Sequence, residues 1–199
     1  AVAWATPLGV AAPMLGEGQQ GVHRWLDLGP LYVNAAMLLL PAFVVALAVV
    51  GPGAAWGWIV ALLTLGALVL QPDASQATAL AIAIAVLGLQ VRSARLRWGI
   101  ALSALSLAAL SWTRPDPLAP VAAVEEVIGL AAALSPWLAA LSVLSLAAVA
   151  ATPVSTTRAS PTDIVRRAGC ALSALLLAWS AAPALSPPAC AALCVRTSR

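Results

Sequence analysis

The side chains that could carry out chemistry in this chain are few and widely separated. Its only histidine is His23, and the sequence contains no HExxH motif, no glycine-rich phosphate loop and no CxxC pair. Such motifs bring together metal ligands, backbone amides or redox thiols at the spacing that catalysis needs. We therefore expect a protein that is not an enzyme and that has no catalytic residues, no metal site and no cofactor.

One pair of acids stands out because of its surroundings. Glu125 and Glu126 are adjacent within a long apolar stretch. Acidic residues inside a membrane often mark a proton or cation path. Adjacent residues on a helix point about 100° apart, so these two carboxyl groups would not share a proton. The alternative is an interfacial helix whose two acids are solvated or paired with Arg114. Asn34 is a third polar candidate, which could line a cavity or cap a helix.

The three cysteines suggest different environments. Cys190 and Cys194 are four residues apart and follow two prolines. In an oxidising compartment they could form a disulfide with each other or with a partner chain. A bridge within a regular helix is strained, so a mutual disulfide requires a non-helical segment. Cys170 is expected to be a small buried residue.

The composition determines the class of protein. The chain has 199 residues, of which 62% are hydrophobic and only 9% charged, with a mean hydropathy of +0.98. A soluble domain needs more charge to cover its surface. The net charge of +3 is too small and scattered for a nucleic-acid-binding module. An integral membrane protein is the class that remains. The abundance of alanine and the absence of lysine suggest a bacterial origin, and hence the inner membrane.

Uncharged runs bounded by turn or charge signals predict an all-α, multi-pass transmembrane bundle. About 20 apolar residues cross a bilayer as a helix, and backbone groups in lipid must be satisfied within the segment. Six segments fit, at residues 31–50, 54–70, 76–91, 98–113, 118–152 and 168–185. Residues 1–30 are expected to form a lead-in and residues 186–199 a tail, both outside this membrane domain.

The fifth segment is too long for a simple crossing. Residues 120–151 number 32, and a continuous helix of that length would extend about 48 Å, against a hydrocarbon core of about 30 Å. Pro136 cannot donate a helical hydrogen bond, so we expect a kink there. Glu125 and Glu126 would then lie near the membrane boundary.

The arginines set the predicted orientation. The loops after the third and fifth segments are the most basic; they contain Arg92, Arg95, Arg97, Arg158, Arg166 and Arg167. Because cytoplasmic loops are enriched in arginine, this side is predicted to be cytoplasmic. Both termini would then lie on the periplasmic side.

Serines at helical spacing indicate helix packing. Ser103 and Ser106, like Ser142 and Ser145, are three residues apart and share a helix face. Small and hydroxyl side chains allow close helix contacts in lipid. Together with the lack of chemistry, these faces suggest a structural or accessory subunit of a larger membrane complex, in contact with lipid and other membrane subunits. The alternative is a transporter or channel component with Glu125, Glu126 and Asn34 in the path.

Overall fold

The structure, a computed structural model, describes residues 2–16, 18, 22–27, 29, 32–114, 127–157 and 162–181. This part of the chain is helical apart from one short antiparallel strand pair, β1 (Trp25–Asp27) with β2 (Tyr32–Asn34). The predicted all-α class is thereby confirmed. The helices are α1 (Val2–Ala11), η1 (Ala12–Leu15), α2 (Ala35–Val50), α3 (Ala55–Leu70), α4 (Ala74–Gly88), α5 (Ala94–Trp112), α7 (Val127–Leu134), α8 (Pro136–Thr157) and α9 (Asp163–Ala181).

Capping side chains and a glycine explain where the helices begin and end. Asn34, Asp73 and Ser93 each accept a hydrogen bond from a backbone N–H in the first turn of α2, α4 and α5, which satisfies donors that have no intrahelical partner. Gly51 ends α2 with φ of +82°, a conformation that glycine adopts without steric cost. These signals lie between apolar runs in the sequence. The observed helices therefore begin and end within a few residues of the expected positions.

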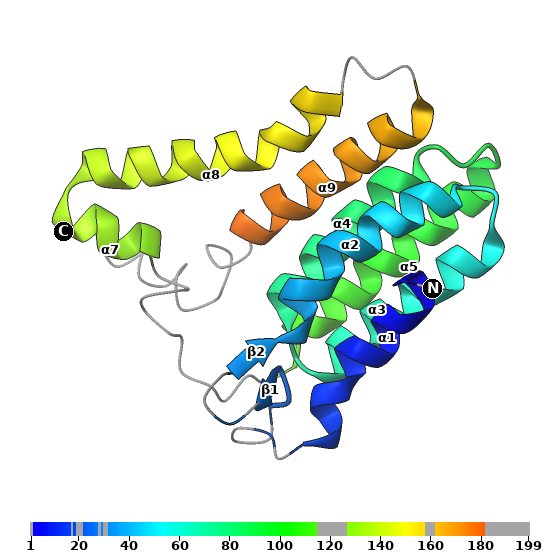
Figure 1. The fold of residues 1–199 in the computed structure, drawn as a ribbon, viewed down its shortest axis with the longest axis horizontal. Coiled ribbons are helices and arrows are strands. Elements are labelled where there is room, and N and C mark those ends of the chain that lie inside the picture. Colours follow the sequence, from blue (N-terminus) through cyan, green and yellow to red (C-terminus); the bar gives the residue numbers. More distant parts are fainter. Residues whose placement is uncertain are drawn as a thin grey trace.

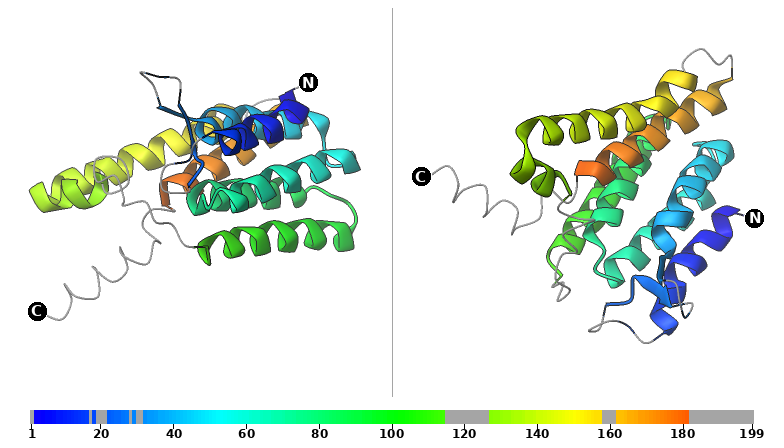
Figure 2. Two further views of the ribbon diagram at one scale, coloured as in Figure 1. Left: turned by 90° about the horizontal axis from the view of Figure 1, so that it is seen from below. Right: turned by 60° about the vertical axis from the view of Figure 1, so that its left-hand side comes forward.

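Helix α4 lies at the centre of the molecule, in contact with α2, α3, α5 and α9. Figure 1 and the second view of Figure 2 show α4 among these helices. The first view of Figure 2 shows α5 as the outermost helix on one face. Four of the nine buried residues of α4 are alanines, which allow neighbouring helices to approach closely. Larger side chains fill the remaining space, including Phe43, Leu65 and Ile84, which are fully buried.

The expected kink at Pro136 is a full reversal of the chain. Helix α7 ends at Leu134, α8 begins at Pro136, and α7 folds back along α8 (Figure 1). Proline fits the first position of a helix because no donor is needed there. The Ser135 hydroxyl accepts a hydrogen bond from the Trp137 N–H at 3.3 Å. The described part of the long apolar segment, from residue 127 onward, therefore forms two helices, which corrects the prediction of one kinked helix.

The N-terminal segment also differs from expectation. Residues 1–30 were expected to lie outside the bundle, yet α1 packs against α2 and α3 and buries Val10 completely. Trp4 stacks on Trp56, in the first turn of α3, with 5.3 Å between ring centroids. The start of α1 is thus at the end of the bundle where α2 meets α3. Helix α1 continues past Pro7, although this proline cannot donate the helical hydrogen bond of its position.

Helix length supports only part of the membrane prediction. Among the described residues, one segment, Pro136–Ser155, is long and apolar enough to cross a bilayer. Helices α2 and α3 have 16 residues each, or roughly 24 Å, which is shorter than a hydrocarbon core of about 30 Å. Length and composition therefore indicate membrane association through α8, and they do not by themselves support a bundle of six spans.

Candidate functional site

Four of the predicted functional residues lie outside the described part of the chain. They are Glu125 and Glu126, proposed for a transport path, and Cys190 and Cys194, proposed for a disulfide. The structure therefore does not test these predictions. Cys170 is described, and it is an exposed free thiol. The expectation that it is buried is wrong, because this side of α9 borders a cavity instead of another helix.

Asn34 belongs to a buried polar cluster at the end of the bundle where α2 and α4 begin. Its Oδ1 accepts a hydrogen bond from the Met37 N–H at 3.1 Å. Asp73 lies beside it and accepts hydrogen bonds from the Gln76 N–H at 3.2 Å and the Ser75 hydroxyl at 3.1 Å. The Asn34 side chain also hydrogen-bonds to Asp73. Asn34 thus caps its own helix and connects the starts of α2 and α4.

Burial has the largest effect on the pKa of Asp73, the acid of this cluster. Asp73 is only 3% exposed, and desolvation raises the pKa of its carboxyl group because the charged form loses hydration. The positive charge of Arg24 and the hydrogen bonds from Gln76, Ser75 and Asn34 act in the opposite direction and lower that pKa. Arg24 is held close by a hydrogen bond from its guanidinium to the Pro72 carbonyl, at 2.9 Å.

Two glutamines extend the polar cluster toward α1 and α4. The Gln71 side-chain amide donates to the Val10 carbonyl. Gln76 is 2% exposed, and within the described residues its Oε1 accepts no hydrogen bond. Most of the polar atoms here satisfy helix ends or link helices, so the cluster fixes how α1, α2 and α4 meet. The Pro72-Asp73 pair ahead of an apolar run is a helix-start signal, and it could have revealed Asp73 from the sequence.

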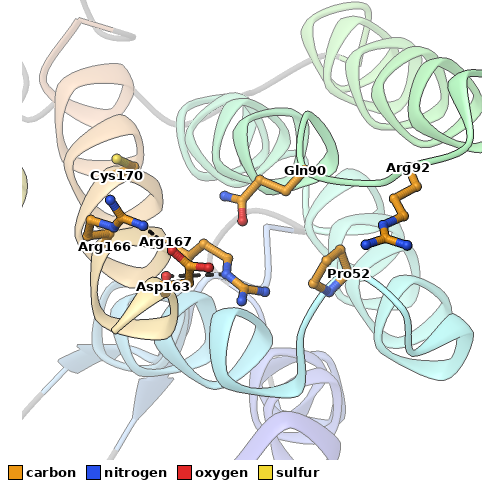
Figure 3. Close-up of a pocket in the computed structure, with 7 residues that line it drawn as sticks. All are labelled: Pro52, Gln90, Arg92, Asp163, Arg166, Arg167 and Cys170. Carbon is orange, nitrogen blue, oxygen red and sulfur yellow. Dashed lines mark hydrogen bonds and ion pairs between the residues drawn. The ribbon is translucent and has the colours of Figure 1, made fainter. Parts of the chain in front are cut away.

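The opposite end of the bundle holds a cavity of about 620 Å³. Figure 3 shows its lining, which comes from the turn after α2, the loop after α4 and the first two turns of α9. The lining residues are Pro52, Gln90, Arg92, Asp163, Arg166, Arg167 and Cys170. The two predicted basic loops are therefore neighbours at one end of the molecule.

The cavity carries an excess of positive charge. Arg166 forms an ion pair with Asp163, and the Arg167 Nε donates to the Asp163 backbone carbonyl at 3.2 Å. Arg92 lies on the other side of the cavity (Figure 3). The described lining residues include three arginines and one aspartate, which leaves two positive charges in excess.

The serine pairs lie on uncovered faces. Ser103 and Ser106 are exposed on the outer face of α5, whereas alanines such as Ala104 form its packed face. The Ser142 and Ser145 hydroxyls donate to carbonyls four residues earlier in α8, each at 2.8 Å. Within the described chain, then, none of the four serines lies in a tight helix contact.

The serine that does join two helices is Ser173. Its hydroxyl accepts a hydrogen bond from the Val154 N–H at 3.0 Å and connects α9 to α8. Val154 follows Pro153, which interrupts the helical hydrogen-bond ladder of α8.

The described residues contain no group of three or more His, Cys, Asp or Glu side chains that could hold a metal ion. In comparisons with known proteins, no family model, curated protein or solved structure matches this chain. Function must therefore be argued from the arrangement of its own residues.

Proposed function

We propose that this chain is a multi-pass protein of the bacterial inner membrane that serves as a non-enzymatic structural or accessory subunit of a larger membrane complex. Support for the membrane location comes from the outer surface of the bundle. Large apolar side chains are exposed on several helices, including Leu38 on α2, Leu63 on α3 and Leu102 on α5. A soluble monomer rarely exposes such a continuous apolar surface, whereas lipid covers it without cost.

The ends of the bundle support the same proposal. Among described residues, charged side chains lie in end loops, next to the strands or in the first two turns of a helix. Tryptophans gather there too, with Trp56 and Trp98 toward the arginine-rich end and Trp112 at the other. Tryptophan rings prefer the headgroup region. The short helices would be matched by local thinning of the bilayer and by arginine side chains that extend to the interface.

The proposed orientation follows from the same arrangement. Arg92, Arg95, Arg97, Arg166 and Arg167 belong to the arginine-rich end, while Arg24 and Arg114 belong to the other. The positive-inside rule makes the first end cytoplasmic. The start of α1 then lies on the cytoplasmic side, because Trp4 stacks on Trp56 there. This placement replaces the earlier prediction of a periplasmic start.

The observation that carries the subunit proposal is the exposure of α8. This helix is the longest and contacts α7 and α9, while its remaining faces point away from the bundle (Figure 1). Trp137 is 82% exposed and Leu144 65% exposed. The uncovered surface also carries Ser145 beside Ser142, which is part-buried. Small hydroxyl residues within an apolar helix face favour packing against another transmembrane helix, so α8 is the surface that a partner subunit would cover.

Purification in a mild detergent tests the proposal. We expect the native chain to elute with other membrane proteins at a fixed stoichiometry. Replacing Ser142 and Ser145 by tryptophan should release it from the complex, because bulky rings prevent close helix approach. The matched control replaces Ser103 and Ser106, which are equally spaced on α5, and should leave the complex intact. Recovery of the native protein only as a lone monomer would overturn the subunit proposal.

A further inference from the structure

The cavity at the arginine-rich end has the features of an anion-binding site. Its walls come from three separate parts of the chain. Two of them contribute side chains that donate hydrogen bonds: Gln90 and Arg92 from the loop after α4, and Arg166 and Arg167 from α9 (Figure 3). Its volume of about 620 Å³ falls in the range of roughly 300–1,000 Å³ that is common for small-molecule sites.

Little of this positive charge is neutralised within the cavity. Asp163 is the single acid among the described residues of the lining, and Arg166 already pairs with it. Arg167 uses its Nε for the Asp163 backbone carbonyl, so its two terminal nitrogens are still directed toward the cavity and the neighbouring turn at Gly51. Within the described chain, Arg92 makes no hydrogen bond or ion pair. Among the described residues, therefore, neither the Arg92 nor the Arg167 guanidinium group has an acidic partner.

The chemistry of guanidinium groups favours phosphate. An arginine presents several N–H donors in a planar fork that fits two oxygens of a phosphate at once. The cavity also lies where the apolar surfaces of α2, α4 and α9 end, which is the depth of lipid headgroups if the bundle spans the membrane. Basic pockets between transmembrane helices on the cytoplasmic side bind acidic headgroups.

We propose that this cavity binds the phosphate of an anionic phospholipid, with Arg92 and Arg167 as its main ligands and Gln90 as an additional donor. This inference rests on the proposed membrane location, but not on the proposed role as a subunit. The bound headgroup would join the α4–α5 loop to the start of α9. In the described structure, contacts between helices α4 and α9 connect these two parts of the chain.

Native mass spectrometry of the full chain in detergent, titrated with phosphatidylglycerol or phosphatidylcholine, tests the proposal. We expect the native protein to bind the anionic lipid at least tenfold more tightly than the zwitterionic one. Replacing Arg92 and Arg167 together by glutamine should abolish that preference. The matched control replaces Arg95 and Arg97 by glutamine. Both residues lie in the first turn of α5, close in sequence to Arg92 but not among the lining residues of the cavity. This double variant removes the same charge and should change the affinity by less than twofold.

Each outcome has a definite meaning. An equal loss of affinity in the control double variant would overturn the proposal, because general interfacial charge would then explain binding. Competition by millimolar inorganic phosphate with the same dependence on Arg92 and Arg167 would assign the cavity to a soluble phosphate ligand. The same elution volume for all variants shows that they fold. A monomeric protein that still selects anionic lipid would refute the subunit role alone, whereas a protein that is soluble without detergent would refute the membrane location.

Discussion

Replacing Asp73 by alanine tests whether the buried polar cluster holds the helix starts together. The change removes the acceptor for the Gln76 N–H and the Ser75 hydroxyl, at 3.2 and 3.1 Å, and leaves Arg24 without its nearest acid in the cluster. Loss of an N-cap costs about 1 kcal/mol, and a buried donor left without a partner costs about 1–3 kcal/mol. We therefore expect the unfolding free energy to fall by about 2–4 kcal/mol, the sum of these two contributions.

Asparagine at the same position separates the hydrogen bonds from the charge. Asp73→Asn retains an acceptor oxygen for the first turn of α4, so we expect a loss below about 1 kcal/mol at neutral pH. Because burial raises the pKa of Asp73, the folded state holds this proton more tightly than the unfolded state. Its contribution to stability is complete below the ordinary pKa of 3.8 and is lost as the pH rises through the raised value. The asparagine variant should lack this pH dependence.

Thermal unfolding in detergent, monitored by size-exclusion elution and repeated across a pH series, measures both the loss of stability and its pH dependence. One kcal/mol shifts the midpoint by about 2–4 °C for a chain of this size, so a loss of about 2–4 kcal/mol should make the alanine variant unfold about 4–16 °C below the native protein. The reasoning is refuted if alanine and asparagine variants unfold at the same temperature. It is also refuted if the native protein gains stability, relative to Asp73→Asn, as the pH rises.

Three further predictions concern other parts of the chain. Ser173→Ala should destabilise the protein by about 1–2 kcal/mol, because the Val154 N–H loses its acceptor, whereas Ser103→Ala should change the unfolding temperature by less than 2 °C. With Cys190 and Cys194 replaced by serine, a membrane-impermeant maleimide should label the exposed Cys170 in inverted membrane vesicles but not in intact cells; the reverse would contradict the proposed orientation. Finally, glutamine at Glu125 and Glu126 should leave assembly and any ion flux unchanged; loss of flux with intact assembly would favour the transport alternative.

The sequence by itself predicted helices α2, α3, α4, α5 and α9, with ends within five residues of those observed, but it did not predict that α1 packs in the bundle. Apolar runs interrupted by the Gly51-Pro52 and Pro72-Asp73 signals begin and end helices locally, since capping and backbone conformation depend on neighbouring residues. The break at Pro136 follows from the same kind of local reasoning, because proline lacks the donor that would continue α7 into α8. The proximity of the two arginine loops followed from counting crossings, which needs no knowledge of side-chain contacts.

Only the tertiary structure decided which faces of these helices are covered. The spacing of Ser103 and Ser106 resembles that of a packing face, yet alanines occupy the contact side of α5, because a nearly uniform Ala-Leu-Ser composition gives every face a similar hydropathy. The reversal at Ser135, the packing of α1 on α2 and α3, and the pairing of Ser173 with Val154 depend on contacts between distant segments. A proline or an apolar run shows where a helix stops, but its direction afterwards depends on the surface against which it packs.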